Sequence, residues 1–228
     1  MAAKPVNPFS PYPSNHGPIK LFVYGEPGTM KTRRAMSLPG PKAIIDLEDG
    51  AGDYQDLASA EKGDIYLATK SVTKMEEALT YLESLPLGTI KTLIIDPITV
   101  VWQQLQQGHI QRILRRGYIM HFNKQSGRKE KVDITDPEEV PFEMGDWNKI
   151  KTRHGDIMTR LMNLPMHVVL IARGGEKNDQ NGKSKGYGFD GEKNIPFLVK
   201  QVVEAHEDGS DIVKKDRTGT FREGGRMK

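Results

Sequence analysis

The feature of this sequence that most constrains its fold is the alternation of short apolar segments with amphipathic ones. The apolar segments are rich in β-branched and aromatic residues and predict buried strands at 19–24, 42–50, 91–102 and 166–173, the third closed by Asp96-Pro97. The spacing of apolar residues between them predicts helices over 31–38, 71–85 and 147–164. Strands that are apolar on both faces and alternate with helices indicate an α/β fold, a mostly parallel sheet with helices on both faces.

The chain reads as one folded domain, residues 19–228, behind a flexible N-terminal arm. Residues 1–18 contain five prolines and few apolar side chains. Two stretches interrupt the alternation of the domain: a basic insertion at about 112–145 and a mobile loop at about 174–194, rich in Gly, Lys and Asn. After them, 194–208 leads into a strand or hairpin at 210–219.

Composition excludes several classes of protein. No apolar run approaches the roughly 20 residues of a membrane helix, and no signal-peptide core is present, so we expect a cytoplasmic protein without a membrane partner. The absence of cysteine excludes disulfides and thiolate metal sites. The net charge of +3 permits a nucleic-acid partner without requiring one.

The segment GEPGTMKT, which follows the first predicted strand and opens a predicted helix, is one residue away from the phosphate-loop pattern G-x-x-x-x-G-K-[ST]. In such a loop, backbone amides face phosphate oxygens, Lys31 would reach the β- and γ-phosphates, and Thr32 would offer its hydroxyl to Mg²⁺. The alternative is an ordinary Gly-Pro turn before a helix. The residues predicted to bind ATP are Gly25, Glu26, Pro27, Gly28, Thr29, Met30, Lys31, Thr32 and Arg33.

Met30 stands where the pattern requires glycine. A side chain in a sparsely populated backbone region costs about 1–3 kcal/mol. That cost could weaken nucleotide affinity by up to roughly a hundredfold. The other reading is that the Met30 side chain points outward in a relaxed variant of the loop.

Polar residues follow three of the predicted strands, where a parallel sheet binds its ligands. Asp96 ends an apolar strand and could hold Mg²⁺, or could cap the turn before Pro97. Glu48 is a candidate general base, or a solvated acid in a loop. Arg173 leaves a buried strand and could sense the γ-phosphate, or could be an ordinary surface residue.

The order of GEPGTMKT, IIDLEDG, TLIIDP, VVLIAR and IVKKDR resembles the RecA-type recombinase core. More closely, it resembles the small RecA-like ATPases of bacteriophages that act as single-strand annealing proteins, over residues 19–225. The resemblance implies a RecA-like P-loop NTPase core. It also implies that Glu48 is the catalytic glutamate, that Asp96 is the Walker B ligand of Mg²⁺, and that Arg173 occupies the sensor position.

The resemblance extends to assembly. Lys215 and Arg217 are similar to a basic pair that reaches into the site of the neighbouring subunit, which implies a homo-oligomer, either a ring or a filament. A cation donated in this way would couple hydrolysis to assembly. The alternative is that these residues, with Lys214, form a solvated face of an edge strand.

The most basic stretch, 112–131, holds seven Lys or Arg residues against one acid, with aromatic residues interleaved. Cations combined with aromatic rings are typical of single-strand binding. In RecA-like proteins, loops at places similar to 112–145 and 174–194 contact single-stranded DNA; the alternative is two solvated insertions. The candidate DNA-contacting residues are Arg115, Arg116, Lys124, Arg128, Lys129, Lys183, Lys185, Tyr187 and Phe189.

These interpretations predict an oligomeric, DNA-stimulated ATPase that binds single-stranded DNA and promotes annealing or recombination. A phage-encoded protein would act in the host cytoplasm, with phage or host recombination or single-strand-binding proteins as further partners. One alternative is a nucleotide-binding scaffold or regulator with little hydrolysis, which Met30 favours. Another is a P-loop small-molecule kinase, in which 112–131 would form the lid.

Overall fold

The computed structural model describes residues 17–228, except 55, 135, 137, 139, 141, 179–181, 220–223, 225 and 228, and it leaves undescribed the side chains at 51, 178, 185, 226 and 227. Nearly all of the predicted N-terminal arm, residues 1–16, lies outside the described residues. In the described part of the chain, no helix is long and apolar enough to cross a membrane.

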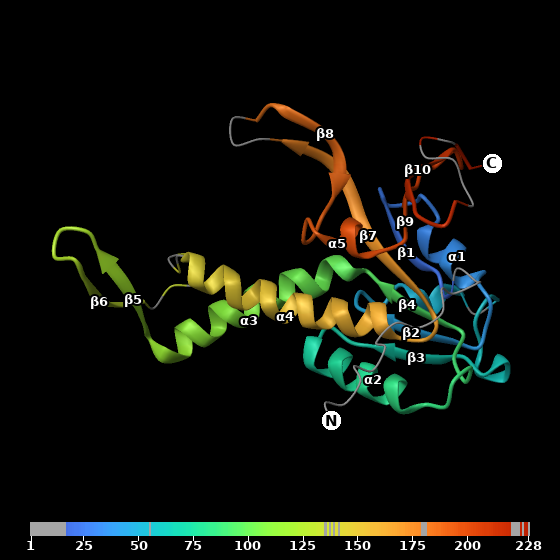
Figure 1. Cartoon of the computed structure of the whole chain (residues 1–228), viewed down its shortest axis with the longest axis horizontal. Helices are drawn as coiled ribbons and strands as arrows, with labels where there is room; N and C mark the ends of the chain where they lie inside the picture. Colours follow the sequence, from blue (N-terminus) through green and yellow to red (C-terminus); the bar gives the residue numbers. More distant parts are fainter. Residues whose placement is uncertain are drawn as a thin grey trace, which may run out of the picture.

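A mixed sheet, nine-stranded in the described part of the chain, forms the centre of the molecule in the order β11-β10-β9-β1-β7-β4-β2-β3, with β8 paired to β7 (Figure 1). Neighbours from β9 to β3 run parallel, whereas β8, β10 and β11 are antiparallel to their partners. The predicted mostly parallel sheet is confirmed. Its strands are β1 (Lys20–Gly25), β2 (Lys42–Asp46), β3 (Ile65–Ala68), β4 (Thr92–Asp96), β7 (His167–Asn178), β8 (Ser184–Phe189), β9 (Gln201–Glu204), β10 (Asp211–Asp216) and β11 (Arg226–Met227).

Helices cover both faces of this sheet, as expected, but unequally (Figure 1). The first face carries α2 (Val72–Ser84), α3 (Ile98–Arg116), α4 (Met144–Asn163) and the short α5 (Ile195–Leu198). The second face carries α1 (Lys31–Met36) and residues in and after η1 (Ala51–Tyr54); a second 3₁₀ turn, η2 (Ala60–Lys62), precedes β3.

The central strands are apolar throughout because their two faces enter two cores. Phe22 of β1 packs toward α2–α4, whereas its neighbour Val23 packs toward α1. Leu93 and Ile94 of β4 divide in the same way. Successive side chains of a strand point to opposite faces, so a sheet covered on both sides requires unbroken apolar runs.

The stretch 91–102 was predicted as a strand closed by Asp96-Pro97, but its second half is helical. Strand β4 ends at Asp96, Pro97 is the N-cap residue, and α3 begins at Ile98. Helical spacing was present in the sequence, because the buried residues of α3 include Ile98, Val101, Leu105, His109 and Ile113.

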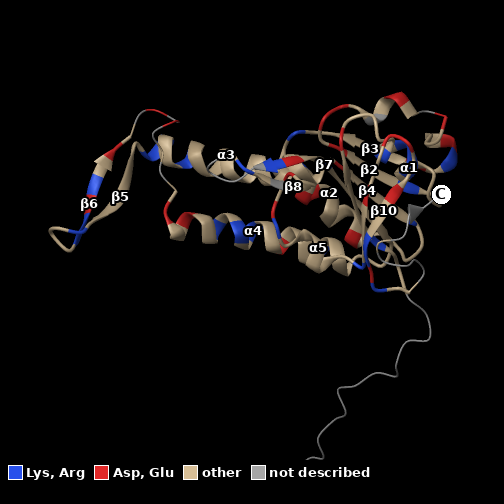
Figure 2. Cartoon of the chain, turned by 90° about the horizontal axis from the view of Figure 1, so that it is seen from above, with Lys and Arg blue, Asp and Glu red and all other residues tan. Residues whose placement is uncertain are grey.

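Residues 98–163 form a helical extension that projects from the sheet (Figures 1 and 2). Its two helices, α3 and α4, lie side by side, and Trp102 stacks on Trp147 at 6.3 Å between ring centroids. At the far end, β5 (Tyr118–Asn123) and β6 (Arg128–Asp133) form an antiparallel hairpin. The predicted basic insertion at 112–145 therefore comprises the end of α3, this hairpin and the approach to α4.

The stretch 174–194, predicted as a mobile loop, is in large part a second hairpin. Strand β7 continues to Asn178 and pairs with β8. Figure 1 shows this hairpin leaving the sheet separately from the helical extension.

Lys20 fastens the end of α4 to the sheet. Its buried ammonium group donates hydrogen bonds to the carbonyl oxygens of Leu161, Leu164 and Met166 at 3.2, 2.8 and 3.0 Å. The carbonyl groups of Leu161 and Leu164 belong to the helix end and its C-cap, where no intrahelical partner is available, and that of Met166 lies just beyond the helix. Burial lowers the pKa of Lys20 to about 8.

Candidate nucleotide-binding site

The predicted phosphate loop, the two strand-end acids and the strand-end arginine meet at the carboxyl edge of the sheet. Asp46 lies beside Asp96 in the register of β2 and β4, and Gly25 lies beside Arg173 in the register of β1 and β7. A cavity of about 260 Å³ opens between them, and it is lined by Gly25, Pro27, Gly28, Met30, Lys31, Thr32, Glu48, Tyr54, Asp96, Pro97, Ile171, Ala172 and Arg173.

The loop requires glycine at two of its positions. A Cβ atom at Gly25 would lie 2.5 Å from the carbonyl oxygen of Ala205 on the neighbouring chain segment, closer than real Cβ atoms approach. Gly28 has φ +85°, a left-handed conformation that side chains disfavour. Both glycines let the chain turn sharply beside β9.

Met30 adopts the left-handed backbone that the missing glycine would have taken, with φ 59° and ψ 21°. Met30 is 53% exposed and contributes to the lining of the cavity. The loop therefore keeps a glycine-like backbone at Met30, which agrees with the first reading, a side chain held in a sparsely populated backbone region. The strain of such a residue is about 1–2 kcal/mol.

Lys31 lies folded over the loop. Its Nζ donates to the carbonyl oxygens of Gly25 at 2.9 Å and Glu26 at 2.6 Å, and to Oγ1 of Thr29 at 3.1 Å. Burial lowers the pKa of Lys31 below its ordinary value. A partly desolvated ammonium group at the mouth of a cavity is well placed to attract phosphate oxygens.

Thr32 and Asp96 form a pair across the cavity. Oγ1 of Thr32 donates to Oδ2 of Asp96 at 2.5 Å, so two oxygens that suit a hard cation lie together. Burial raises the pKa of Asp96, while the Thr32 hydrogen bond and the charge of Lys31 oppose that rise. The loop, Lys31 and this oxygen pair fit a nucleotide polyphosphate with Mg²⁺.

Glu48 is held at the edge of the cavity by an ion pair with Arg173. Asp46, which is buried, shapes the turn that presents Glu48: its Oδ1 accepts from the amides of Glu48 at 3.0 Å and Asp49 at 2.7 Å. The hydroxyl of Tyr66 donates to Oδ2 of Asp46 at 2.8 Å. Glu48 and Arg173 are thus brought together, and each is engaged with the other.

Sequence reasoning missed Thr99, in the first turn of α3. Its Oγ1 accepts from the amide of Arg173 at 3.2 Å and donates to the carbonyl oxygen of Asp190 at 3.1 Å. This buried hydroxyl joins the start of the helical extension to the end of the β7–β8 hairpin, beside the cavity. Its position three residues after Asp96 would have been informative once the helix was recognised.

Lys215 and Arg217 lie at the other end of the sheet. Asp216, between them, pairs with Gln201 at the start of β9, whereas the phosphate loop follows the end of β1. Lys215 is predicted to reach into the site of a neighbouring subunit; within its own chain, its Nζ donates to the carbonyl oxygens of Pro196 and, at 2.8 Å, Val199. These acceptors at the end of α5 hold the ammonium group within its own chain; Arg217 is exposed.

The basic candidates for DNA contact gather on the helical extension. The candidates lie at the end of α3 and on the hairpin beyond it, and α4 carries further exposed basic residues (Figure 2). Lys183 is exposed beside β8, and the side chain of Lys185 lies outside the described residues. The exposed candidates on the extension are Arg115, Arg116, Lys124, Arg128 and Lys129.

Tyr187 and Phe189 point toward the sheet, contrary to their predicted role in stacking on bases. The ring of Phe189 meets Phe22 edge-on at 4.8 Å, and the ring of Tyr187 stacks on Tyr24 at 6.2 Å between centroids. Both rings pack against the main core. Their apolar contacts with β1 explain why aromatic residues recur in this hairpin.

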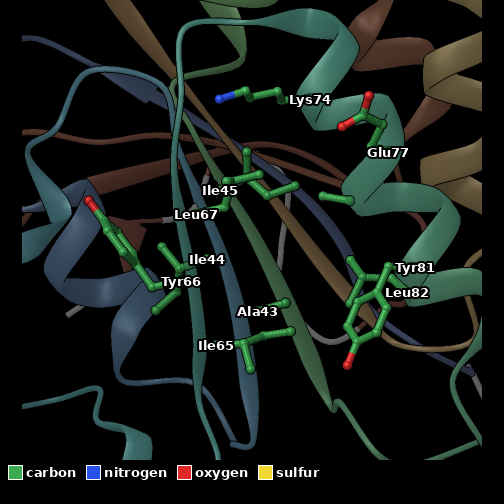
Figure 3. Close-up of a pocket in the computed structure, with 11 residues that line it drawn as sticks. Ala43, Ile44, Ile45, Ile65, Tyr66, Leu67, Lys74, Glu77, Tyr81 and Leu82 are labelled. Carbon is green, nitrogen blue, oxygen red and sulfur yellow. The ribbon is translucent and has the colours of Figure 1, made fainter.

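A second groove, of about 340 Å³, lies between edge strand β3 and α2 (Figure 3). Its lining is largely apolar, and Ile65 from β3 lies on the same side of the strands as Tyr81 from α2, whereas the ring of Tyr66 extends to the other side. None of the predicted site residues lines this groove, so it is separate from the cavity at the carboxyl edge.

Comparison with known proteins agrees with this geometry. A family model described as AAA domain matches residues 17–226. A comparison with curated proteins gave no significant match. The family match indicates an AAA-type P-loop NTPase, with nucleotide binding and ATPase activity typical of that class. Because the match covers nearly all of the chain and includes both halves of the cavity, this protein belongs to the AAA domain family.

Proposed function

We propose that this protein is a RecA-like ATPase whose turnover is stimulated by DNA, and that it binds single-stranded DNA to promote annealing or recombination. The observation that carries the proposal is the convergence of Lys31, the Thr32–Asp96 pair and Glu48 on one cavity. Charge neutralisation and positioning are the main contributions of a protein to phosphoryl transfer. This cavity contains groups that can neutralise phosphate charge and groups that can position the reacting atoms.

Each residue then has a distinct role in hydrolysis. Lys31 exchanges its loop carbonyl partners for phosphate oxygens. Thr32 and Asp96 would hold Mg²⁺, which would neutralise phosphate charge. Glu48 accepts a proton from the attacking water. For this step, Arg173 turns from Glu48 to the γ-phosphate, which leaves the carboxylate available as a base.

The DNA part of the proposal is supported by the basic tip of the helical extension. Phosphate contacts made by Lys and Arg dominate nucleic-acid affinity. Helix α3 starts at the Walker B strand and runs to the hairpin, so one element joins the two sites. The RecA resemblance supports three further parts of the proposal: a homo-oligomer, either a ring or a filament; phage or host recombination proteins as partners; and action in a host cytoplasm. Arg217, which is exposed, is the candidate to act on the site of a neighbouring subunit.

The test is phosphate release from ATP, measured with and without single-stranded DNA while protein concentration is varied. We expect DNA to raise turnover and specific activity to rise steeply with concentration. A turnover rate that depends neither on DNA nor on protein concentration would overturn the proposal that the ATPase is DNA-stimulated and oligomeric. Absence of ATP binding would overturn the nucleotide site itself.

A nucleotide-binding scaffold with little hydrolysis is the second candidate, and the Glu48–Arg173 ion pair favours it. An engaged Glu48 is a poor base. The variant Arg173→Gln separates the two functions. An ATPase that needs Arg173 for the γ-phosphate slows in this variant, whereas a protein restrained by the ion pair becomes faster.

A further inference from the structure

The hairpin at the tip of the helical extension has two chemically different faces. In an antiparallel pair, residues directly opposite each other share a face, and successive residues alternate. The first face, called here the outer face, consists of Tyr118, Met120 and Phe122 opposite Asp133, Lys131 and Lys129. The second, called the inner face, consists of Ile119, His121 and Asn123 opposite Val132, Glu130 and Arg128.

Part of the inner face is engaged within the chain. Ile119 is buried in a small core with Ile113 and Ile134. Oxygens of Glu130 accept from Nδ2 of Asn123 at 2.9 and 3.0 Å and from Oγ of Ser126 at 2.6 Å. The packing of Ile119 on Ile113 anchors the hairpin to α3, whereas the hydrogen bonds of Glu130 lie within the hairpin itself.

The outer face carries exposed apolar side chains beside cations. Met120 and Phe122 are 41% and 49% exposed, and they are neighbours on one face of the strand, so their exposed surfaces adjoin. The guanidinium carbon of Arg116 and Nζ of Lys131 each lie 4.9 Å from the centroid of the Tyr118 ring. Lys129 stands opposite Phe122 and is exposed.

The acidic content of the outer face is small. Asp133 accepts from Lys131 at 3.0 Å, but both side chains are more than half exposed, and such pairs contribute little. A polyanion can therefore displace Asp133 from Lys131 at small cost. The face offers rings and cations in alternation, the combination on which single strands bind.

We propose that the outer face is a platform on which the bases of an unpaired nucleic-acid strand stack while Arg116, Lys129 and Lys131 contact its phosphates. This inference rests on the proposed function, which it makes specific to one side of one hairpin. Bases in a duplex are stacked on each other and hide their faces, so a stacking platform selects unpaired strands. Tyr118, Met120 and Phe122 alternate along β5, about 6.8 Å apart at each step, and form a row.

The experiment measures anisotropy of a fluorescein-labelled oligothymidylate titrated with the full-length chain, without ATP. Phe122→Ala is compared with Val132→Ala, an exposed apolar residue of the inner face. We expect Phe122→Ala to weaken binding about tenfold, the lower part of the range for one stacked base. Val132→Ala should change affinity less than twofold.

A second pair of variants removes the same charge from two places. Lys129→Gln with Lys131→Gln changes the outer face, whereas Lys124→Gln with Arg128→Gln changes the turn and the inner face. The outer pair should weaken binding more and reduce the slope of log affinity against log salt by about 1.4, which corresponds to two lost phosphate contacts. Equal effects of the two pairs would overturn the assignment to one face.

Further arms separate the inference from the proposed function. An oligouridylate replaces the DNA strand to distinguish RNA from DNA; tight binding of either supports the platform. A duplex of the same sequence bound as tightly as the single strand would overturn stacking. If Phe122→Ala and Val132→Ala bind alike while DNA still stimulates ATP hydrolysis, the inference fails and the proposed function stands. Circular dichroism confirms that each variant is folded.

Discussion

The carboxyl edge of the sheet and the tip of the helical extension both present cations, but they hold them differently. At the edge, Lys31 is bound to loop oxygens, and Arg173 is paired with Glu48 inside a cavity. At the tip, Lys124 and Lys129 are exposed on a two-stranded hairpin far from the sheet (Figure 2). The first arrangement suits a compact anion of fixed shape, and the second suits an extended one.

Because of this difference, we expect the two regions to respond differently to mutation. Preorganised groups in a cavity act as a unit, so the loss of one member is severe. Each exposed cation contributes a similar, small amount to the affinity for a polyanion. The loss of one cation therefore lowers this affinity only partly, and the size of the effect depends on salt concentration.

Glu48→Gln should have the largest effect. It keeps the shape of the side chain but removes the base, so turnover should fall about 10²–10⁴-fold while ATP still binds. Steady-state phosphate release and nucleotide titration measure the two quantities separately. Glu61→Gln, at an exposed position away from the cavity, is the control. Turnover close to that of the unmodified chain would show that Glu48 is not the base.

Lys31→Ala should weaken ATP binding at least about a hundredfold, because loss of a charged contact in a cavity costs about 3 kcal/mol. Titration with a fluorescent ATP analogue measures the affinity. Lys124→Ala removes the same charge from the tip and should leave ATP affinity unchanged. Equal ATP affinity of the two variants would contradict the assignment of Lys31 to the nucleotide site.

His154, in α4 where the extension joins the sheet, should make stability depend on pH. Burial lowers the pKa of His154 to about 4 from 6.5. The unfolded chain therefore binds the proton more readily, and stability should fall by up to about 3 kcal/mol as pH drops from 6.5 to 4. Urea unfolding across that range measures the loss. His154→Phe should flatten this dependence, and an unchanged slope in that variant would assign it to other groups.

Met30→Gly should have the smallest effect. Glycine relieves the left-handed strain of about 1–2 kcal/mol but adds about 0.5–1 kcal/mol of chain entropy to the unfolded state. We expect a gain in the free energy of unfolding of at most about 1 kcal/mol, with little change in ATP affinity, because the strain belongs to the folded loop itself. A large gain in ATP affinity would instead place the strain in the nucleotide-bound state.

The sheet and the phosphate loop could be predicted because their signals are local. Unbroken apolar runs identified four central strands, and a loop between strand and helix located Lys31 and Thr32. Helix α3 was missed although Val101, Leu105 and His109 repeat at helical spacing. Apolar residues continue on both sides of Asp96-Pro97, so hydropathy alone does not show that the strand ends and a helix begins there.

The contacts of individual side chains could not be predicted, for a different reason. Tyr187 and Phe189 were assigned to DNA from composition, but their rings pack on Tyr24 and Phe22, more than 160 residues earlier in the chain. Lys215 was assigned to a neighbouring subunit, but it holds carbonyl oxygens at the end of α5. A flexible side chain can contact many different groups, and the residues next to it in the sequence do not determine which of these groups it contacts in the fold.

By itself, the sequence determined which segments are buried, where the phosphate loop lies and which residues can carry the chemistry, because burial patterns and turn chemistry act over a few neighbouring residues. Only the tertiary structure decided that Glu48 pairs with Arg173 and that Thr99 links α3 to β7. It also decided that Phe122 and Lys129 share one face of the hairpin. These relations depend on strand order and register, which arise when distant segments pack into one sheet and its extension.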